Sequence, residues 1–200
     1  MDSYIMRKTS SGLTTIRLET HLLSKRKIWL TDSITAELAE ETIAKIFSLV
    51  MDNKSAPIDI LINSPGGDFM AGMTIYDVIQ SCNTPIRLIN IGSAYSMAAV
   101  LLASGKHGRY LLPHASVMIH DPYMSSCTGG TTAVVQQAAD RLSEKRKEMH
   151  RILSTHTGKS MKQIQRATSY DNYMNAEEAI AFGICDGVIS IEEILEGCYE

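Results

Sequence analysis

Apolar and polar positions follow two periods along the chain, and these periods predict strands and helices in turn. Short apolar runs between turn residues predict strands at 27–31, 58–62, 85–91, 109–112, 117–120 and 187–190. Apolar residues spaced three and four apart predict helices at about 33–51, 69–81, 96–103, 132–155, 161–167 and 176–182. Because strands alternate with helices, the pattern favours an α/β domain with a largely parallel sheet.

The first 26 residues show neither the strand period nor the helix period. They are polar and mixed in sign, with a break at Ser10-Ser11-Gly12, and we interpret them as a mobile arm. The full length of 200 residues suits one domain, since a chain of this length can bury a core without disulfides or a metal.

Composition and charge exclude several classes of function. The net charge of −3 argues against a nucleic-acid partner. No apolar stretch approaches the ~18 residues of a membrane span, and the first residues show no secretory signal. Four cysteines are widely spaced, which favours reduced thiols in the cytoplasm or an organelle matrix (Cys82, Cys127, Cys185 and Cys198).

The first junction that could carry chemistry is Asn63-Ser-Pro-Gly-Gly67, between a predicted strand and a predicted helix. Paired glycines allow a close approach of the backbone, and N–H groups beside a helix start suit a developing oxyanion. A plain tight turn is the alternative. The segment is not a phosphate-binding loop, because the glycine spacing and the following Lys are missing.

The second junction is Gly92-Ser-Ala-Tyr-Ser-Met-Ala-Ala99. Ser96, near the start of the helix, could be a nucleophile favoured by the helix dipole. Ser93 is the other candidate. The alternative for either serine is a plain N-cap, which is a common role for this residue type.

A nucleophilic serine needs a base and a group that orients the base. His120 ends an apolar strand, where sites tend to form in parallel sheets, although it could also be a structural strand-end histidine. Asp171 could orient it or could only place charge at a helix start, and Asp121 is a rival. We expect His21, His150 and His156 to be solvated, and the absence of an HExxH pattern predicts no metal.

Four segments in order resemble the proteolytic subunit of the Clp protease family. The resemblance runs from about residue 5 to 189, and each motif is weak alone, but four in register are specific. They are Asn63–Gly67 with Ala71-Gly-Met73 and Ile75-Tyr-Asp77; Gly92–Met97 with Leu101–Gly105; Arg109-Tyr110, Leu112-Pro113 and Val117–His120; and His156-Thr-Gly158, Asp171, Ala176–Ala179 and Phe182-Gly-Ile184.

The resemblance implies a serine endopeptidase with Ser96 as nucleophile, His120 as base and Asp171 as the orienting acid. It places the oxyanion hole on the backbone N–H groups of Gly67 and Met97. It also implies a crotonase-like α/β fold of repeated ββα units with a protruding helical handle. The single peptidase domain, 1–200, would then comprise an arm at about 1–26, a head at about 27–122 and 170–190, and a handle at about 123–169.

The resemblance further implies partners. The family forms seven-membered rings stacked as a tetradecamer, and a AAA+ unfoldase threads unfolded polypeptides into the enclosed chamber. That partner uses ATP, so we expect no cofactor, no nucleic acid and no membrane association for this chain, which we place in the cytoplasm or an organelle matrix.

Some positions depart from the family pattern. An acid and an Arg that help to join the rings are replaced by Ser169 and Tyr170, which predicts weaker ring stacking. Aromatic residues of the pocket for the unfoldase are replaced by Leu61 and Ser81, which predicts a pocket that is altered or shared with a paralogous subunit. The segment Tyr123–Thr128 is also atypical.

Two other functions remain open from the sequence. A mainly structural subunit of a mixed ring would explain the departures, although the Ser, His and Asp set argues against it. A crotonase-type acyl-CoA enzyme would share the fold and a glycine-based oxyanion hole, but it would not need that set of three residues.

Overall fold

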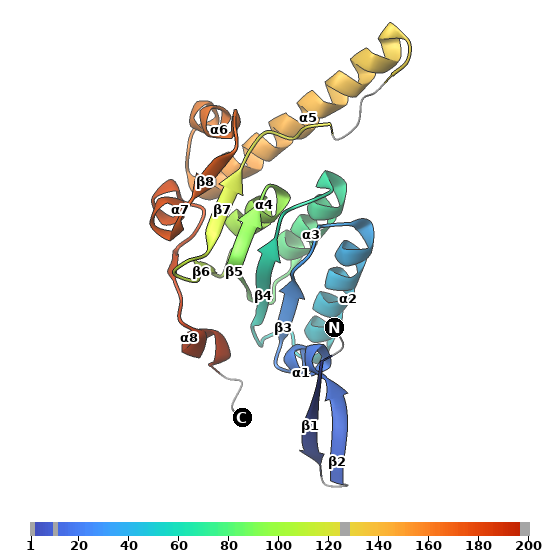
Figure 1. Ribbon diagram of the computed structural model, residues 1–200, viewed down its shortest axis with the longest axis vertical. Helices are drawn as coiled ribbons and strands as arrows, with labels where there is room; N and C mark the ends of the chain where they lie inside the picture. The colour runs from blue at the N-terminus through green and yellow to red at the C-terminus, as the bar shows by residue number, and fades with distance from the viewer. Residues whose placement is uncertain (1–2, 10–11, 125–128, 197–200) are drawn as a thin grey trace.

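The computed structural model describes residues 3–9, 12–124 and 129–196, and its centre is a largely parallel sheet (Figure 1). Within the described residues this sheet has seven strands in the order β3-β4-β5-β6-β9, with β7 between β5 and β8. The strands are β3 Lys27–Leu30, β4 Ile58–Ser64, β5 Ile86–Tyr95, β6 Arg109–Leu111, β7 Ser116–Ile119, β8 Asn172–Met174 and β9 Gly187–Val188. Each pair is parallel except β7 with β8, so the predicted mixed α/β fold with a largely parallel sheet is confirmed.

Among the described residues, six helices contribute buried side chains to the main core. They are α2 Ala36–Asp52, α3 Phe69–Ser81, α4 Met97–Ala103, α5 Thr132–Thr157, α6 Met161–Thr168 and α7 Ala176–Phe182. Helix α4 is buried along its whole length, and the other five present one apolar side each, which in α5 is confined to Met149–Leu153. This arrangement follows from their apolar stripes, because burial of such a stripe removes apolar surface from water at about 25 cal/mol per Å².

The two faces of the sheet bury different side chains of the same strands. In β4, Ile58, Ile60 and Ile62 enter the main core with the helices. Leu61 points to the opposite face, where it packs with Ile89, Ile189 and Ile194 of α8 (Ile191–Leu195) in a second, smaller core. The alternation is the one that the pleat of a strand imposes.

The segment interpreted as a mobile arm contains regular secondary structure in its described residues. Strands β1 Tyr4–Thr9 and β2 Gly12–Arg17 form an antiparallel hairpin, and α1 Leu18–Ser24 connects it to β3. The hairpin lies away from the main sheet and pairs only within itself among the described residues. Most of its side chains are exposed. The sequence therefore lacks the alternation of apolar and polar residues that identifies a half-buried strand.

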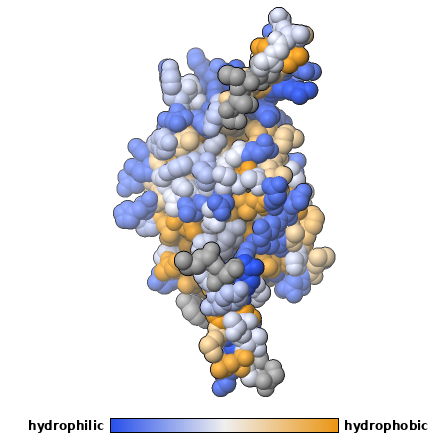
Figure 2. Space-filling view, turned by 45° about the vertical axis from the view of Figure 1, so that its right-hand side comes forward, coloured by the Kyte–Doolittle hydropathy of each residue, from blue (hydrophilic) through white to orange (hydrophobic). Residues whose placement is uncertain are grey.

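Two segments project from opposite ends of the molecule. Helix α5 (Thr132–Thr157) extends beyond the body at one end, and the β1–β2 hairpin extends at the other (Figure 1). Apolar side chains lie exposed on both projections, and Figure 2 shows apolar colouring at both ends. They include Tyr4, Met6, Leu13, Val134 and Val135.

Candidate active site

The sheet brings the predicted site residues to one edge. Strands β4, β5 and β7 are parallel and adjacent, so the segments that follow them, with Gly66, Ser96 and His120, emerge at the same edge. Strand β8 runs antiparallel to β7 with Asn172 opposite Ile119, and this pairing places Asp171 next to His120. The topology therefore gathers residues that are up to 105 positions apart, from Gly66 to Asp171.

Ser96 occupies the turn between β5 and α4 in a strained conformation. Its φ is +53° and its ψ is −121°, which a residue with a side chain rarely adopts and which costs on the order of 1–3 kcal/mol. Its backbone N–H donates to Met118 O at 2.8 Å and holds the turn against β7. Ser96 stands at the N-cap position, but its side chain makes no capping hydrogen bond. The hydroxyl is left free for another partner.

That partner is the imidazole of His120. Ser96 Oγ lies 2.8 Å from His120 Nε2, and His120 Nδ1 lies 3.1 Å from Asp171 Oδ1. A proton on Nδ1, donated to the carboxylate, leaves Nε2 to accept the hydroxyl proton of Ser96. The side chain of His120 is 14% exposed and that of Asp171 is 58% exposed. The hydrogen-bonded side chains therefore become more exposed from His120 to Asp171.

The glycine pair lies directly against the serine turn. A Cβ on Gly66 would stand 2.5 Å from Tyr95 O and 2.8 Å from Ser96 Cβ, so only glycine allows this approach. Ile34 N donates to Gly66 O, and Asp68 N donates to Ile34 O, both at 2.8 Å. The backbone N–H of Gly67 donates to no acceptor within the described part of the chain.

This contact also corrects the predicted start of the first long helix. Ile34 is held extended beside Gly67, so α2 begins only after Thr35, whose Oγ1 accepts from Leu38 N at 3.2 Å. The periodicity of the sequence predicted a start at about residue 33. Helix α3 begins after Asp68, whose carboxylate accepts from Ala71 N at 2.8 Å.

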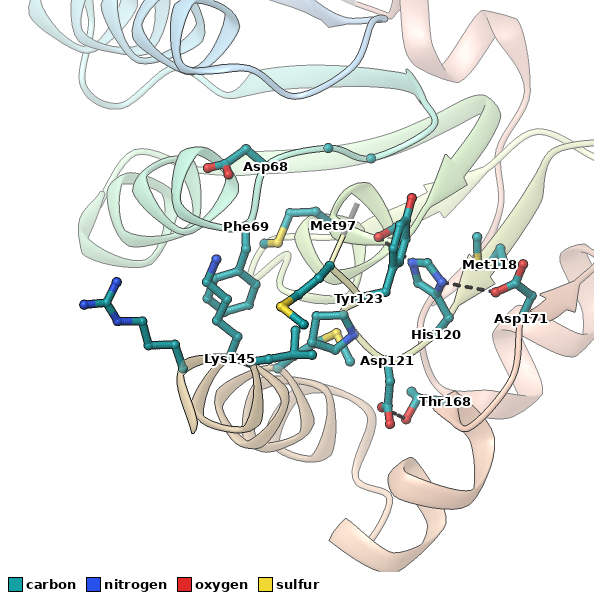
Figure 3. A pocket seen from close by; sticks show the side chains of 18 of the residues that line it. Asp68, Phe69, Met97, Met118, His120, Asp121, Tyr123, Lys145, Thr168 and Asp171 are labelled. Atoms are coloured by element: carbon teal, nitrogen blue, oxygen red, sulfur yellow. Dashed lines mark hydrogen bonds and ion pairs between the residues drawn. The ribbon is translucent and has the colours of Figure 1, made fainter. Parts of the chain in front are cut away.

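A groove of about 1520 Å³ runs past the Ser96 hydroxyl. One wall is the glycine segment with Phe69 and Met97, and the other is the inner side of α5 (Figure 3). The ammonium of Lys145 on α5 lies 5.7 Å from the centre of the Phe69 ring. Tyr123 sets its ring edgewise to His120, with 5.6 Å between the ring centres. The groove has apolar side chains, including Met97 and Met118, in the same lining as the Ser96 hydroxyl.

The rival residues have other partners. Ser93 Oγ donates to Asn63 Oδ1 at 2.9 Å. Asp121 does not orient His120, because its Oδ1 lies 2.7 Å from His150 Nε2. The expectation that His150 is solvated is wrong, since the residue is 5% exposed. His156 is also half-buried, with Nε2 3.1 Å from the hydroxyl of Tyr76.

The sequence missed the burial of His150 although a signal was present. His150 follows Met149 and precedes Ile152 and Leu153, which form the buried stripe of α5. A histidine inside an apolar stripe needs a polar partner, and Asp121 and Thr168 provide it.

The positions that depart from the family pattern fall in different surroundings. Ser169 and Tyr170 are exposed at the groove rim, with Tyr170 86% exposed. Leu61 is buried in the second core, and Ser81 is exposed at the end of α3. Of the atypical segment 123–128, Tyr123 and Met124 are exposed, and 125–128 lie outside the described residues.

Thiol chemistry, metal binding and membrane insertion find little support in the described residues. Burial raises the pKa of the Cys185 thiol to about 12, so it carries no reactive thiolate near neutral pH. Cys82 and Cys185 are free thiols, and Cys127 and Cys198 lie outside the described residues. The described part of the chain has no cluster of three metal-ligating side chains. No helix in that part is long and apolar enough to cross a membrane.

A hydroxyl, an imidazole and a carboxylate in series, beside backbone N–H groups at a helix start, define the serine hydrolase class. Comparison with known proteins narrows the class. The family model of the Clp proteases matches residues 10–192. Two relatives, each named ATP-dependent Clp protease proteolytic subunit 2, come from Chlamydia trachomatis serovars D and A. Each is 38% identical over 188 residues, which cover 94% of this chain and 92% of the relative. The chain therefore belongs to the Clp protease family and is a serine peptidase.

Proposed function

We propose that this chain is the proteolytic subunit of an ATP-dependent protease and that Ser96, His120 and Asp171 are its catalytic triad. The observation that carries the proposal is the unbroken hydrogen-bonded series from the Ser96 hydroxyl through His120 to Asp171. The family match and the printed names of the two relatives support the same activity.

The geometry suits a two-step acyl transfer. His120 Nε2 takes the proton of Ser96 as Oγ attacks the carbonyl carbon of the scissile peptide bond, and it then gives that proton to the departing amine. A water molecule, deprotonated by the same nitrogen, hydrolyses the acyl-enzyme. Asp171 holds the tautomer with the proton on Nδ1 and stabilises the imidazolium in each step.

We assign the oxyanion hole to the backbone N–H groups of Gly67 and Met97. The first N–H groups of a helix have no intrahelical acceptor, so that of Met97 is available at the start of α4. The positive φ angles of Gly66 and Gly67, +89° and +154°, support the assignment because they hold the segment against Ser96. Removal of one such donor typically costs about 10² to 10³ in turnover.

The substrates we propose are unfolded polypeptides delivered by a AAA+ unfoldase that hydrolyses the ATP. The open groove would accept an extended chain, and the sequence has no phosphate-binding loop of its own. We place the protein in the cytoplasm or an organelle matrix and expect it to need neither a cofactor nor a metal.

The assembly we propose is a seven-membered ring that stacks on a second ring through the handles. Ser169 and Tyr170 cannot form the acid–Arg pair of the family pattern, and this departure favours a stack completed by a paralogous subunit. The same departure supports a second candidate function, a mainly structural subunit of a mixed ring.

A fluorophosphonate probe and peptide hydrolysis test the proposal together. The wild-type protein should react covalently with the probe and cleave a short fluorogenic peptide. Ser96→Ala should lose labelling and lower turnover by about 10⁴ to 10⁶, with the assembly unchanged.

Ser93→Ala is the matched control, because Ser93 lies three residues earlier and donates to Asn63 instead. It should label as the wild type does. Labelling of the Ser96→Ala protein at the wild-type rate would show that the nucleophile is misassigned. An inert wild-type protein would favour the structural subunit.

A further inference from the structure

We propose that Asp121, His150 and Thr168 form a positioning unit. The unit connects the inner end of α5 to the two segments that carry His120 and Asp171. The inference rests on the proposed function, since it concerns how the triad is held. None of the three side chains contacts the Ser96 hydroxyl, so each acts through the residues that it positions.

The three side chains share a single oxygen atom. Asp121 Oδ1 lies 2.7 Å from His150 Nε2 and accepts from the Thr168 hydroxyl at 2.6 Å. His150 Nε2 is also 2.9 Å from Thr168 Oγ1, which closes a triangle. The backbone adds a further link, because Asp121 N donates to Thr168 O at 2.7 Å.

Each member belongs to a different segment of the site. Asp121 follows His120 directly, Thr168 ends α6 three residues before Asp171, and His150 lies on α5. Figure 3 shows the bonded Asp121 and Thr168 beneath the His120–Asp171 pair, next to α5. The unit therefore fixes the spacing between the segment that carries His120 and the segment that carries Asp171.

Burial makes this unit rigid. The side chain of His150 is 7% exposed, Thr168 is fully buried, and the side chain of Asp121 is 26% exposed. Charge-assisted hydrogen bonds are short and strong, and a buried polar group left without a partner is costly. The guanidinium of Arg146, one turn earlier on α5, adds a more distant charge at 3.9 Å from Asp121 Oδ2.

The catalytic pair needs such support because it has little of its own. Among the described residues, the carboxylate of Asp171 bonds to His120 alone, and its side chain is 58% exposed. A displacement of a reacting group by 1 Å can cost on the order of 10² in rate. A shift of either loop would lengthen the His120–Asp171 bond, so the unit sets the turnover rate without contacting substrate.

The test compares matched pairs of substitutions within the intact assembly. Thr168→Val and His150→Leu remove a polar partner at similar size, whereas Thr168→Ser and His150→Gln keep one. The control is Glu148→Gln, because Glu148 lies on the same helix and pairs with the exposed Arg151 on the solvent side. Active sites are counted by fluorophosphonate labelling, assembly is checked by sedimentation velocity, and kcat and KM are measured with a short peptide.

We expect Thr168→Val and His150→Leu to lower kcat per labelled site by on the order of 10- to 100-fold, with KM within about twofold. Thr168→Ser, His150→Gln and Glu148→Gln should stay within about threefold of the wild type. If a variant that lacks its polar partner does not fold, Asp121→Asn replaces it, since it keeps the size and removes the charge.

Unchanged kcat per labelled site in an active enzyme would overturn the positioning unit and leave the proposed function intact. A fall in kcat that only matches a loss of assembly would also overturn it, because the role would then be structural. An inactive wild-type protein would instead contradict the proposed function itself.

Discussion

Two Asp–His pairs lie side by side near the inner end of α5, and they differ in almost every physical respect. In the first, His120 Nδ1 is 3.1 Å from Asp171, whose side chain is 58% exposed. In the second, His150 Nε2 is 2.7 Å from Asp121, and the histidine side chain is 7% exposed. The first pair leaves its other ring nitrogen to Ser96, whereas the second binds Thr168 with the same nitrogen.

The difference teaches that the neighbourhood of a residue, more than its type, sets its role. His120 and Asp121 are adjacent in the sequence, but successive side chains of extended backbone point to opposite sides. Each therefore pairs with a residue from elsewhere in the chain. Under the proposed function the open pair moves a proton to and from the substrate, whereas the closed pair holds its surroundings in place.

The largest effect should come from the open pair. Asp171→Asn keeps the size of the side chain but no longer favours the required tautomer or offsets the imidazolium charge. We expect kcat/KM for a short peptide to fall by about 10⁴, by analogy with the same change in another serine protease, while the fold persists. Steady-state kinetics and circular dichroism measure both quantities. A rate near that of the wild type would show that Asp171 is not the orienting acid.

Ring assembly should affect the open pair next. Ser169 and Tyr170 directly precede Asp171, and Tyr170 is 86% exposed, so this side of the pair has little cover among the described residues. We expect a substantial population of single rings or smaller species at low micromolar concentration, with weak peptidase activity. The acid–Arg contact that Ser169 and Tyr170 replace is worth on the order of 1.5–3 kcal/mol.

Sedimentation velocity with parallel activity measurements checks this prediction. Higher concentration, or a paralogous subunit that carries the charged pair, should raise the mass and the activity together. A fully active double ring of this chain alone that persists on dilution would show that Tyr170 compensates by apolar packing.

The smallest effect concerns a third histidine, which pairs with no carboxylate in the described part of the chain. Burial, and to a smaller extent the nearby Arg109, lowers the pKa of His156, whose Nε2 faces the Tyr76 hydroxyl. A histidine with a lowered pKa binds its proton more readily in the unfolded chain. Stability is therefore retained above the unfolded pKa of about 6.5 and falls as the pH drops below it.

Thermal unfolding at pH 7 and pH 5 measures this contribution. The wild type should lose more stability over this range than His156→Asn, by on the order of 1–2 °C in Tm. An equal loss in both proteins would assign the pH dependence to groups other than His156.

Much of the fold could be predicted because its elements follow the two periods closely. Helices α3, α4 and α5 begin within a residue of their predicted positions, and the sheet is largely parallel. The hairpin at 4–17 could not be predicted, since its exposed side chains carry no pattern of burial. Strand β8 is only three residues long and gains its strand character from pairing with β7.

The residues of the site could be predicted in part. Ser96, His120 and Asp171 are brought together as residue-level reasoning and the family resemblance suggested, because each stands where a strand begins or ends. The roles of His150 and Thr168 could not be read from the sequence. Their contact joins positions 121, 150 and 168, and only the packing of α5 and α6 brings these positions together.

Helix α5 contains a well-packed part and a poorly packed part. Its 26 residues span roughly 39 Å, yet its buried side chains all lie between Met149 and Leu153. No capping hydrogen bond from Thr131 and no acidic residue support its first turn, so little among the described residues holds the outer turns. Amide hydrogen exchange should therefore be fast in the outer turns and slow around Leu153 in the isolated subunit. Slower exchange in the outer turns alone would register contact with another subunit, so one helix reports on both assembly and core stability.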